Sequence, residues 1–88
     1  MLRDATDRYI ALRRTLGYKL IKTERHLRAF SDFAADRGEI HIRVATVLRW
    51  LETVAGTPNT RARRMSEIIL FARFLHAEDT HHEIPRTN

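Results

Sequence analysis

The sequence contains no cysteine, which excludes disulfide bridges and cysteine-ligated zinc sites. It has only 3 glycines and 2 prolines, so it has little room for long structureless segments. No apolar run approaches the roughly 18 residues that a membrane-spanning helix needs. The mixed charges of the N-terminal segment are unlike the apolar centre of a signal peptide. We therefore expect a cytoplasmic protein with no membrane association.

The chain is rich in positive charge, which is unevenly distributed along the sequence. The 88 residues carry a formal net charge of +5, with a hydrophobic content of 43%, as in a single small globular domain. The net charge is +5 over residues 1–28 and +3 over 58–74, but −1 over 29–57 and −2 over 75–88. Two separate basic blocks favour an anionic partner, most often nucleic acid, although an ordinary basic surface gives the same totals.

Apolar residues recur at helical spacing in the first half of the chain. A line that begins at Ala5 predicts a helix over roughly residues 3–16, closed by Gly17. A second helix is expected from Thr23, as the N-cap, to Gly38, as the stop signal. The expected core-facing residues of these helices are Ala5, Tyr9, Leu12, Leu16, Leu27, Phe30, Phe33 and Ala34.

The second half of the chain predicts two more helices. The first is expected from Val44 to Gly56, with a core stripe formed by Val44, Val47, Leu48, Leu51, Val54 and Ala55. The second follows a turn at 57–60 and is apolar on one side at first, then on most of its circumference over 68–75. Its first half therefore has a free face, which carries Thr60, Arg63 and Arg64.

The predicted fold class is all-α, a compact bundle of four short helices. The bundle is expected to span residues 1–80, followed by a linker over 81–88. Both Ile40 and Ile42, in the connection before the third helix, are expected to lie under the core.

No catalytic constellation, cofactor or metal site is predicted. The chain has no cysteine nucleophile and no glycine-rich phosphate loop, and its only serines are Ser31 and Ser66. The spacing of His76, His81 and His82 does not match the i, i+4 pair that places two imidazoles on one helical face. The last two are therefore interpreted as solvated residues.

Two stretches of the sequence resemble the N-terminal part of tyrosine recombinases, the phage-integrase family. "YIALRRTLGYKLIKTERHLRAFSDFA" is similar to the opening of that part, where Leu-Gly-Tyr precedes a Ser- or Thr-led helix. "TPNTRARRMSEIILFARFLH" is similar to its fourth helix, and "HEIP" to the linker that follows. The matching positions are Leu16, Gly17, Tyr18, Thr23, Leu27, Phe30, Phe33, Thr60, Arg63, Arg64, Met65, Ser66, Ile68, Phe71, Phe74 and Leu75.

The resemblance implies a SAM-like core-binding domain that clamps double-stranded DNA at a recombination site. In that family the second and fourth helices face the DNA, and a later domain supplies the catalytic residues. The chain is therefore expected not to be an enzyme by itself, and neither Tyr9 nor Tyr18 is a candidate nucleophile. The parent protein is expected to act as a tetramer on DNA, and the fragment alone to be a monomer.

Both basic blocks centre on a predicted helix start, where free N–H groups attract phosphate. Lysines there suit contact with the DNA backbone, and an arginine can also read guanine. The two threonines can cap their helices or donate to a phosphate. The predicted DNA-binding residues are Lys19, Lys22, Thr23, Arg25, Arg28, Thr60, Arg61, Arg63 and Arg64.

Two other functions fit the same charge distribution. A helical protein-interaction module would present its basic face to an acidic partner, with Leu70 and Phe74 as exposed docking residues. A helix-turn-helix regulator would use the turn at 56–59. Against the regulator, the second half of the following helix lacks the uniformly polar face of a recognition helix.

Overall fold

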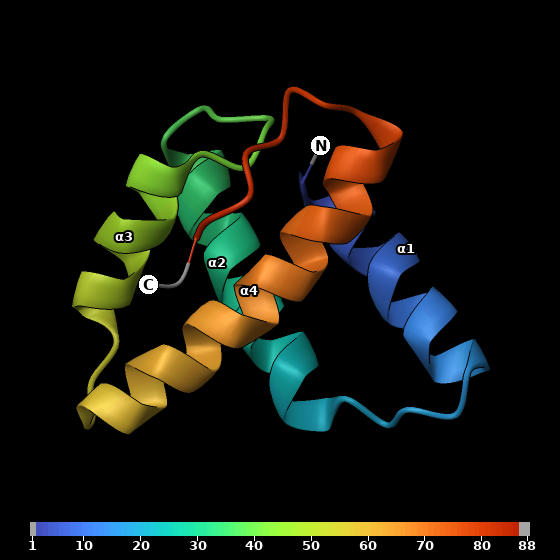
Figure 1. The fold of residues 1–88 in the computed structure, drawn as a ribbon, viewed down its shortest axis with the longest axis horizontal. Helices are drawn as coiled ribbons and strands as arrows, with labels where there is room; N and C mark the ends of the chain where they lie inside the picture. The colour runs from blue at the N-terminus through green and yellow to red at the C-terminus, as the bar shows by residue number, and fades with distance from the viewer. Residues whose placement is uncertain (1, 87–88) are drawn as a thin grey trace.

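Four helices and no strand make up the part of the chain that is described here, residues 2–86 of a computed structural model. The helices are α1 (Leu2–Thr15), α2 (Ile21–Asp36), α3 (Val44–Thr53) and α4 (Pro58–Glu78), and 72% of the described residues are helical. In Figure 1, α4 crosses in front of α2, with α3 on one side and α1 on the other. Both α2 and α4 contact all three other helices, whereas α1 and α3 do not contact each other over the described range. The predicted all-α bundle is confirmed.

Aromatic side chains join the four helices at the centre of the bundle. Phe30 of α2 and Phe71 of α4 are fully buried. The ring of Tyr9 in α1 lies 5.2 Å from Phe71, and the ring of Trp50 in α3 lies 5.5 Å from Phe30. Such pairs add about 0.5–1.5 kcal/mol beyond the burial of their area. The other large side chains that are fully buried in this core are Leu27, Ile42, Val47, Ile68 and Leu75.

The expected core stripes of α1 and α3 are partly wrong. Leu12 and Leu16 are 44% and 64% exposed, and Ile10 is buried instead. Figure 1 shows that α1 diverges from α2 toward the segment that connects them. Leu12 belongs to the last turn of α1 and Leu16 follows its end at Thr15, so both lie in this diverging part of the chain. In α3, Trp50 is buried and Leu48 is 49% exposed, because the buried stripe is centred slightly further around the helix than expected.

Two further side chains depart from the expected core. Ile42 is fully buried, but Ile40 is 58% exposed, so only one isoleucine of this connection reaches the core. Leu70 is 46% exposed on α4, whereas Phe74 packs on Tyr9 with ring centroids 5.2 Å apart. The second half of α4 is therefore not covered on every side. Within residues 2–86, no helix has the length and apolar composition needed to cross a bilayer.

Helix α2 begins at Ile21, earlier than the predicted start at Thr23. Leu20 takes the N-cap position in the left-handed conformation, with φ 55°, and its carbonyl accepts a hydrogen bond of 2.8 Å from the Glu24 N–H. Non-glycine residues rarely adopt this conformation. Thr23 lies inside the helix and does not cap it, because its hydroxyl donates to Glu67 of α4 at 2.6 Å.

The residues after α4 fold back onto the connection between α2 and α3. The Glu83 N–H donates to the Ile42 carbonyl at 2.9 Å, and the Ile42 N–H donates to His82 Nδ1 at 3.0 Å. His82 is only 8% exposed, and Ile84 packs against the core. Burial lowers the pKa of His82, which favours the neutral ring that can accept this hydrogen bond. The expectation that His82 is solvated is therefore wrong.

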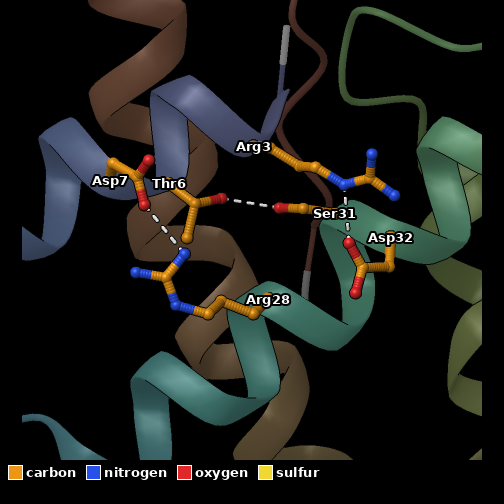
Figure 2. A pocket seen from close by; sticks show the side chains of 6 residues that line it. All are labelled: Arg3, Thr6, Asp7, Arg28, Ser31 and Asp32. Carbon is orange, nitrogen blue, oxygen red and sulfur yellow. Dashed lines mark hydrogen bonds and ion pairs between the residues drawn. The ribbon is translucent and has the colours of Figure 1, made fainter.

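Polar side chains cross the seam between α1 and α2 (Figure 2). The hydroxyls of Thr6 and Ser31 are buried and lie 2.6 Å apart. Because the Thr6 hydroxyl donates to the Leu2 carbonyl at 2.9 Å, Ser31 supplies the proton for the contact between them. Two exposed ion pairs flank this contact, Arg3 with Asp32 at 2.7 Å and Arg28 with Asp7 at 2.8 Å. Exposed pairs of this kind contribute little to stability.

We expect the Thr6–Ser31 contact to show strong coupling in a double-mutant cycle. Thr6→Val leaves the Ser31 hydroxyl buried without its partner, so the free energy of unfolding should fall by about 1–3 kcal/mol. Adding Ser31→Ala removes both buried polar groups, and the double variant should be no less stable than Thr6→Val alone. Urea denaturation of the wild type, both single variants and the double variant measures this, and strictly additive losses would contradict it.

Candidate nucleic-acid interface

A groove of about 540 Å³ separates the first turns of α2 from the first half of α4, and is called here the α2–α4 groove. Figure 1 shows that both helices begin at the same end of the bundle. The groove is lined by Lys22, Arg25, His26, Thr57, Asn59, Thr60, Arg63, Arg64 and Glu67. Two basic blocks that are far apart in the sequence therefore form one surface.

The start of α4 is fixed by three residues that precede or open the helix. Thr57 is the N-cap, and its hydroxyl oxygen accepts from the Thr60 N–H at 3.3 Å. Pro58 occupies the first turn, where its missing N–H is not needed. Gly56 has φ +125°, and a Cβ there would lie 3.1 Å from Thr60 Oγ1. Thr57 caps the helix in place of Thr60, whose side chain is left to line the groove.

Glu67 ties the two walls of the groove together. One carboxylate oxygen accepts from Thr23 Oγ1 at 2.6 Å, and the other contacts His26 Nδ1 at 2.7 Å. The side chains of His26 and Glu67 are only 15% and 17% exposed. An ionised carboxylate only accepts hydrogen bonds, so His26 carries its proton on Nδ1. Both oxygens of Glu67 are thus engaged with α2.

The cations of the groove lack carboxylate partners. Within residues 2–86, no ion pair involves any of its four cations, Lys22, Arg25, Arg63 and Arg64. Arg28 differs, because it contacts Asp7 and Glu24 at 2.8 Å each. Hydrogen bonds from Arg28 and then Arg14 hold the pKa of Glu24 below its ordinary value. The side of α2 that faces α1 is therefore neutralised, while the side that faces α4 keeps its positive charge.

The structure separates the predicted DNA-binding residues into two sets. Those that line the groove are Lys22, Arg25, Thr60, Arg63 and Arg64. Lys19 is exposed outside it, and Arg61 Nη2 lies 3.4 Å from the Val54 carbonyl at the end of α3. Thr23 is bound to Glu67, and Arg28 lies at the seam with α1.

Four lining residues were not predicted as contacts, although helical spacing could have found two of them. Glu67 follows Arg63 at i+4, and His26 follows Lys22 at i+4, so each extends the face already identified. Thr57 and Asn59 carry no such signal. They line the groove because of the turn geometry before and at the start of α4.

Neither tyrosine lines the groove. Tyr9 is 4% exposed, and burial raises its pKa above the ordinary value of 10.0, which disfavours the reactive phenolate. Tyr18 is 51% exposed, with the Arg13 guanidinium carbon 4.3 Å from its ring centroid. The groove therefore offers positive charge for binding and no tyrosine hydroxyl for nucleophilic attack.

Comparison with known proteins adds one relationship to this geometry. No family model matches the chain, and no solved structure matches it. A protein of Sinorhizobium fredii (strain NBRC 101917 / NGR234), named "Putative integrase/recombinase y4rB", is 36% identical over 84 residues. The match covers 94% of this chain and 27% of that protein, so the chain spans about a quarter of the relative's length. The sequence identity supports a relationship between this chain and the integrase family.

Proposed function

We propose that this chain is a DNA-binding domain of an integrase or recombinase, and that the α2–α4 groove receives the phosphate backbone of duplex DNA. The observation that carries the proposal is a set of four cations in one groove, none of which forms an ion pair with a carboxylate of the described residues. Elsewhere on the bundle, arginines such as Arg3, Arg8 and Arg28 are paired with acids at 2.7–2.8 Å. Unpaired cations gathered in one place attract a polyanion most strongly.

The helix starts add to the attraction of these side chains. The N-terminus of a helix carries a partial positive charge of roughly half an elementary charge. Because α2 and α4 begin at the same end of the bundle, both positive ends lie close to the cations of the groove (Figure 1). A phosphate beside Arg63 would also lie near the first turn of α4. The groove thus suits a ligand with regularly spaced negative charge.

The alternatives have less support in the structure. A protein-interaction module was expected to expose Leu70 and Phe74, but Phe74 packs on Tyr9 and only Leu70 is largely exposed. For a helix-turn-helix regulator, α4 would have to present a free recognition face, yet α4 contacts all three other helices. Duplex binding needs only the exposed first half of α4.

The proposed role is to hold DNA, without strand cleavage by this chain. The relative is a much longer protein, of which this chain matches 27%. In a longer protein of the same kind, we assign strand cleavage to residues outside the matched stretch. The bundle would then grip one side of a recombination site, in an assembly of several copies on the DNA.

The proposal predicts weak, strongly salt-dependent binding to duplex DNA. If four phosphates are neutralised, log K should fall with log salt at a slope of about −3.6, with a dissociation constant of roughly 10⁻⁴ to 10⁻⁶ M. Arg63→Ala/Arg64→Ala should reduce the slope to about −1.8, because two of these contacts are lost. Fluorescence anisotropy of a labelled duplex over a salt series measures both values.

Arg73→Ala is the matched control for this experiment. Arg73 is exposed on the same helix, nine positions after Arg64 and so on the opposite face at 100° per residue. This variant should keep the wild-type slope. Absence of binding at low salt, or equal losses in the control and in the double variant, would overturn the assignment of the groove.

A second prediction concerns the one carboxylate of the groove. Glu67→Gln removes a negative charge beside the phosphate path and keeps the shape of the side chain. We expect roughly two- to fivefold tighter binding at low salt, the scale of one charge pair in high dielectric. Glu52→Gln, on the exposed surface of α3, removes the same charge outside the groove and should have little effect. Equal effects of the two variants in the anisotropy assay would show that only net charge matters.

A further inference from the structure

A cluster of histidine and aspartate lies at the opposite end of α4 from the groove. His41 belongs to the connection between α2 and α3, Asp79 follows the last turn of α4, and His81 lies in the turn after it. Figure 1 shows the segment after α4 running beside the α2–α3 connection. Residues far apart in the sequence thus meet in a place that the proposed DNA-binding role does not use.

The donor atoms of the three side chains converge. One oxygen of Asp79 lies 3.1 Å from His41 Nε2, and the other lies 2.7 Å from His81 Nδ1. One ligand atom from each residue can be chosen so that all three lie within 4.8 Å of one another. Donors of a tetrahedral zinc site lie about 3.3 Å apart, given bonds of about 2.0–2.1 Å to the ion. The cluster is therefore within a small side-chain adjustment of metal-binding geometry.

The backbone already holds two of the three ligands in place. The Asp79 N–H donates to the Leu75 carbonyl at 2.8 Å, and the His81 N–H donates to the Asp79 carboxylate at 3.0 Å. His41 precedes Ile42, whose N–H and carbonyl both bind the segment after α4. The side chain of His81 is 78% exposed, so it can rotate without disturbing packing.

We propose that His41, Asp79 and His81 bind a divalent transition-metal ion of the zinc type. Two imidazoles and one carboxylate suit Zn²⁺, Co²⁺ and Ni²⁺, whereas Mg²⁺ and Ca²⁺ prefer oxygen ligands alone. Three protein ligands leave one position for water. Arg8 lines a shallow pocket together with His41 and Asp79, and it is paired with Glu78 at 2.7 Å, so its positive charge is offset beside the ion. The bound ion would link the α2–α3 connection to the segment that follows α4.

The sequence did not predict this site because the partners are in different segments. Spacing arguments considered His76, His81 and His82 together, but His76 Nδ1 lies 2.7 Å from the His82 carbonyl and His82 Nδ1 accepts from Ile42. The second imidazole of the site comes from His41, in a connection with no helical or strand periodicity.

Calorimetric titration of the untagged 88-residue chain with Zn²⁺ at neutral pH tests the proposal. We expect one saturable site in the micromolar range, and a rise in the thermal midpoint that EDTA reverses. His81→Ala should weaken binding at least tenfold, which is about 1.4 kcal/mol, while circular dichroism shows an unchanged fold. Asp79→Asn should weaken it as well. Titration with Co²⁺ should produce the visible absorption of a tetrahedral ion in the wild type and not in His81→Ala.

His26→Asn is the matched control, because it removes a histidine that contacts a carboxylate in the α2–α4 groove. This variant should bind Zn²⁺ like the wild type. The proposal is overturned if the wild type shows no saturable binding up to submillimolar Zn²⁺. It is also overturned if His81→Ala and Asp79→Asn both bind as tightly as the wild type.

Discussion

The crossing of α4 over α2 is the contact on which the rest of the molecule depends. Phe30 of α2 and Phe71 of α4 are fully buried where the two helices meet α3 and α1. Glu67 adds a polar tie between the same two helices, with both oxygens engaged by α2. Because this crossing fixes where α2 and α4 begin relative to each other, it also fixes the shape and charge of the groove between their first turns.

The distribution of neutralised and unneutralised charge distinguishes the faces of the bundle. Between α1 and α2, arginines and acids alternate across the seam and cancel. Among the described residues that line the α2–α4 groove, Glu67 is the only one with a carboxylate, and it is bound to Thr23 and His26 and forms no ion pair with the neighbouring arginines. The positions of the acidic residues relative to the basic ones therefore say more about a binding surface than the net charge of +5 does. This difference is what makes the groove, rather than the whole basic surface, the candidate for contact with DNA.

Much of the fold could be predicted from the sequence because the signals of a helix, apolar periodicity and terminating residues, are local in the sequence. Apolar periodicity, together with glycine stops such as Gly17 and Gly38, located four helices and the main buried face of α2. Periodicity could not show that Leu12 and Leu16 are exposed, because their exposure depends on the angle between α1 and α2.

The candidate site was only partly predictable for the same reason. Charge clustering identified both walls of the groove, but could not reveal that Arg28 is neutralised by Asp7 of a different helix. The capping role of Thr57 and the burial of His82 likewise depend on the path of the backbone through a turn and a returning segment. Such contacts between distant segments leave no periodic signal in a single sequence.

The hydroxyl pair between α1 and α2 has a consequence beyond its own bond strength. Contacts between apolar side chains are not directional, so they discriminate less sharply than a hydrogen bond against a shift of one helical turn, about 5.4 Å. Such a shift would carry Thr6 away from Ser31 and leave the buried Ser31 hydroxyl without its partner, at about 1–3 kcal/mol, whereas Thr6 would keep its bond to the Leu2 carbonyl of the same helix. The pair therefore disfavours conformations in which α1 is shifted along α2, and favours the alignment that places Thr6 beside Ser31.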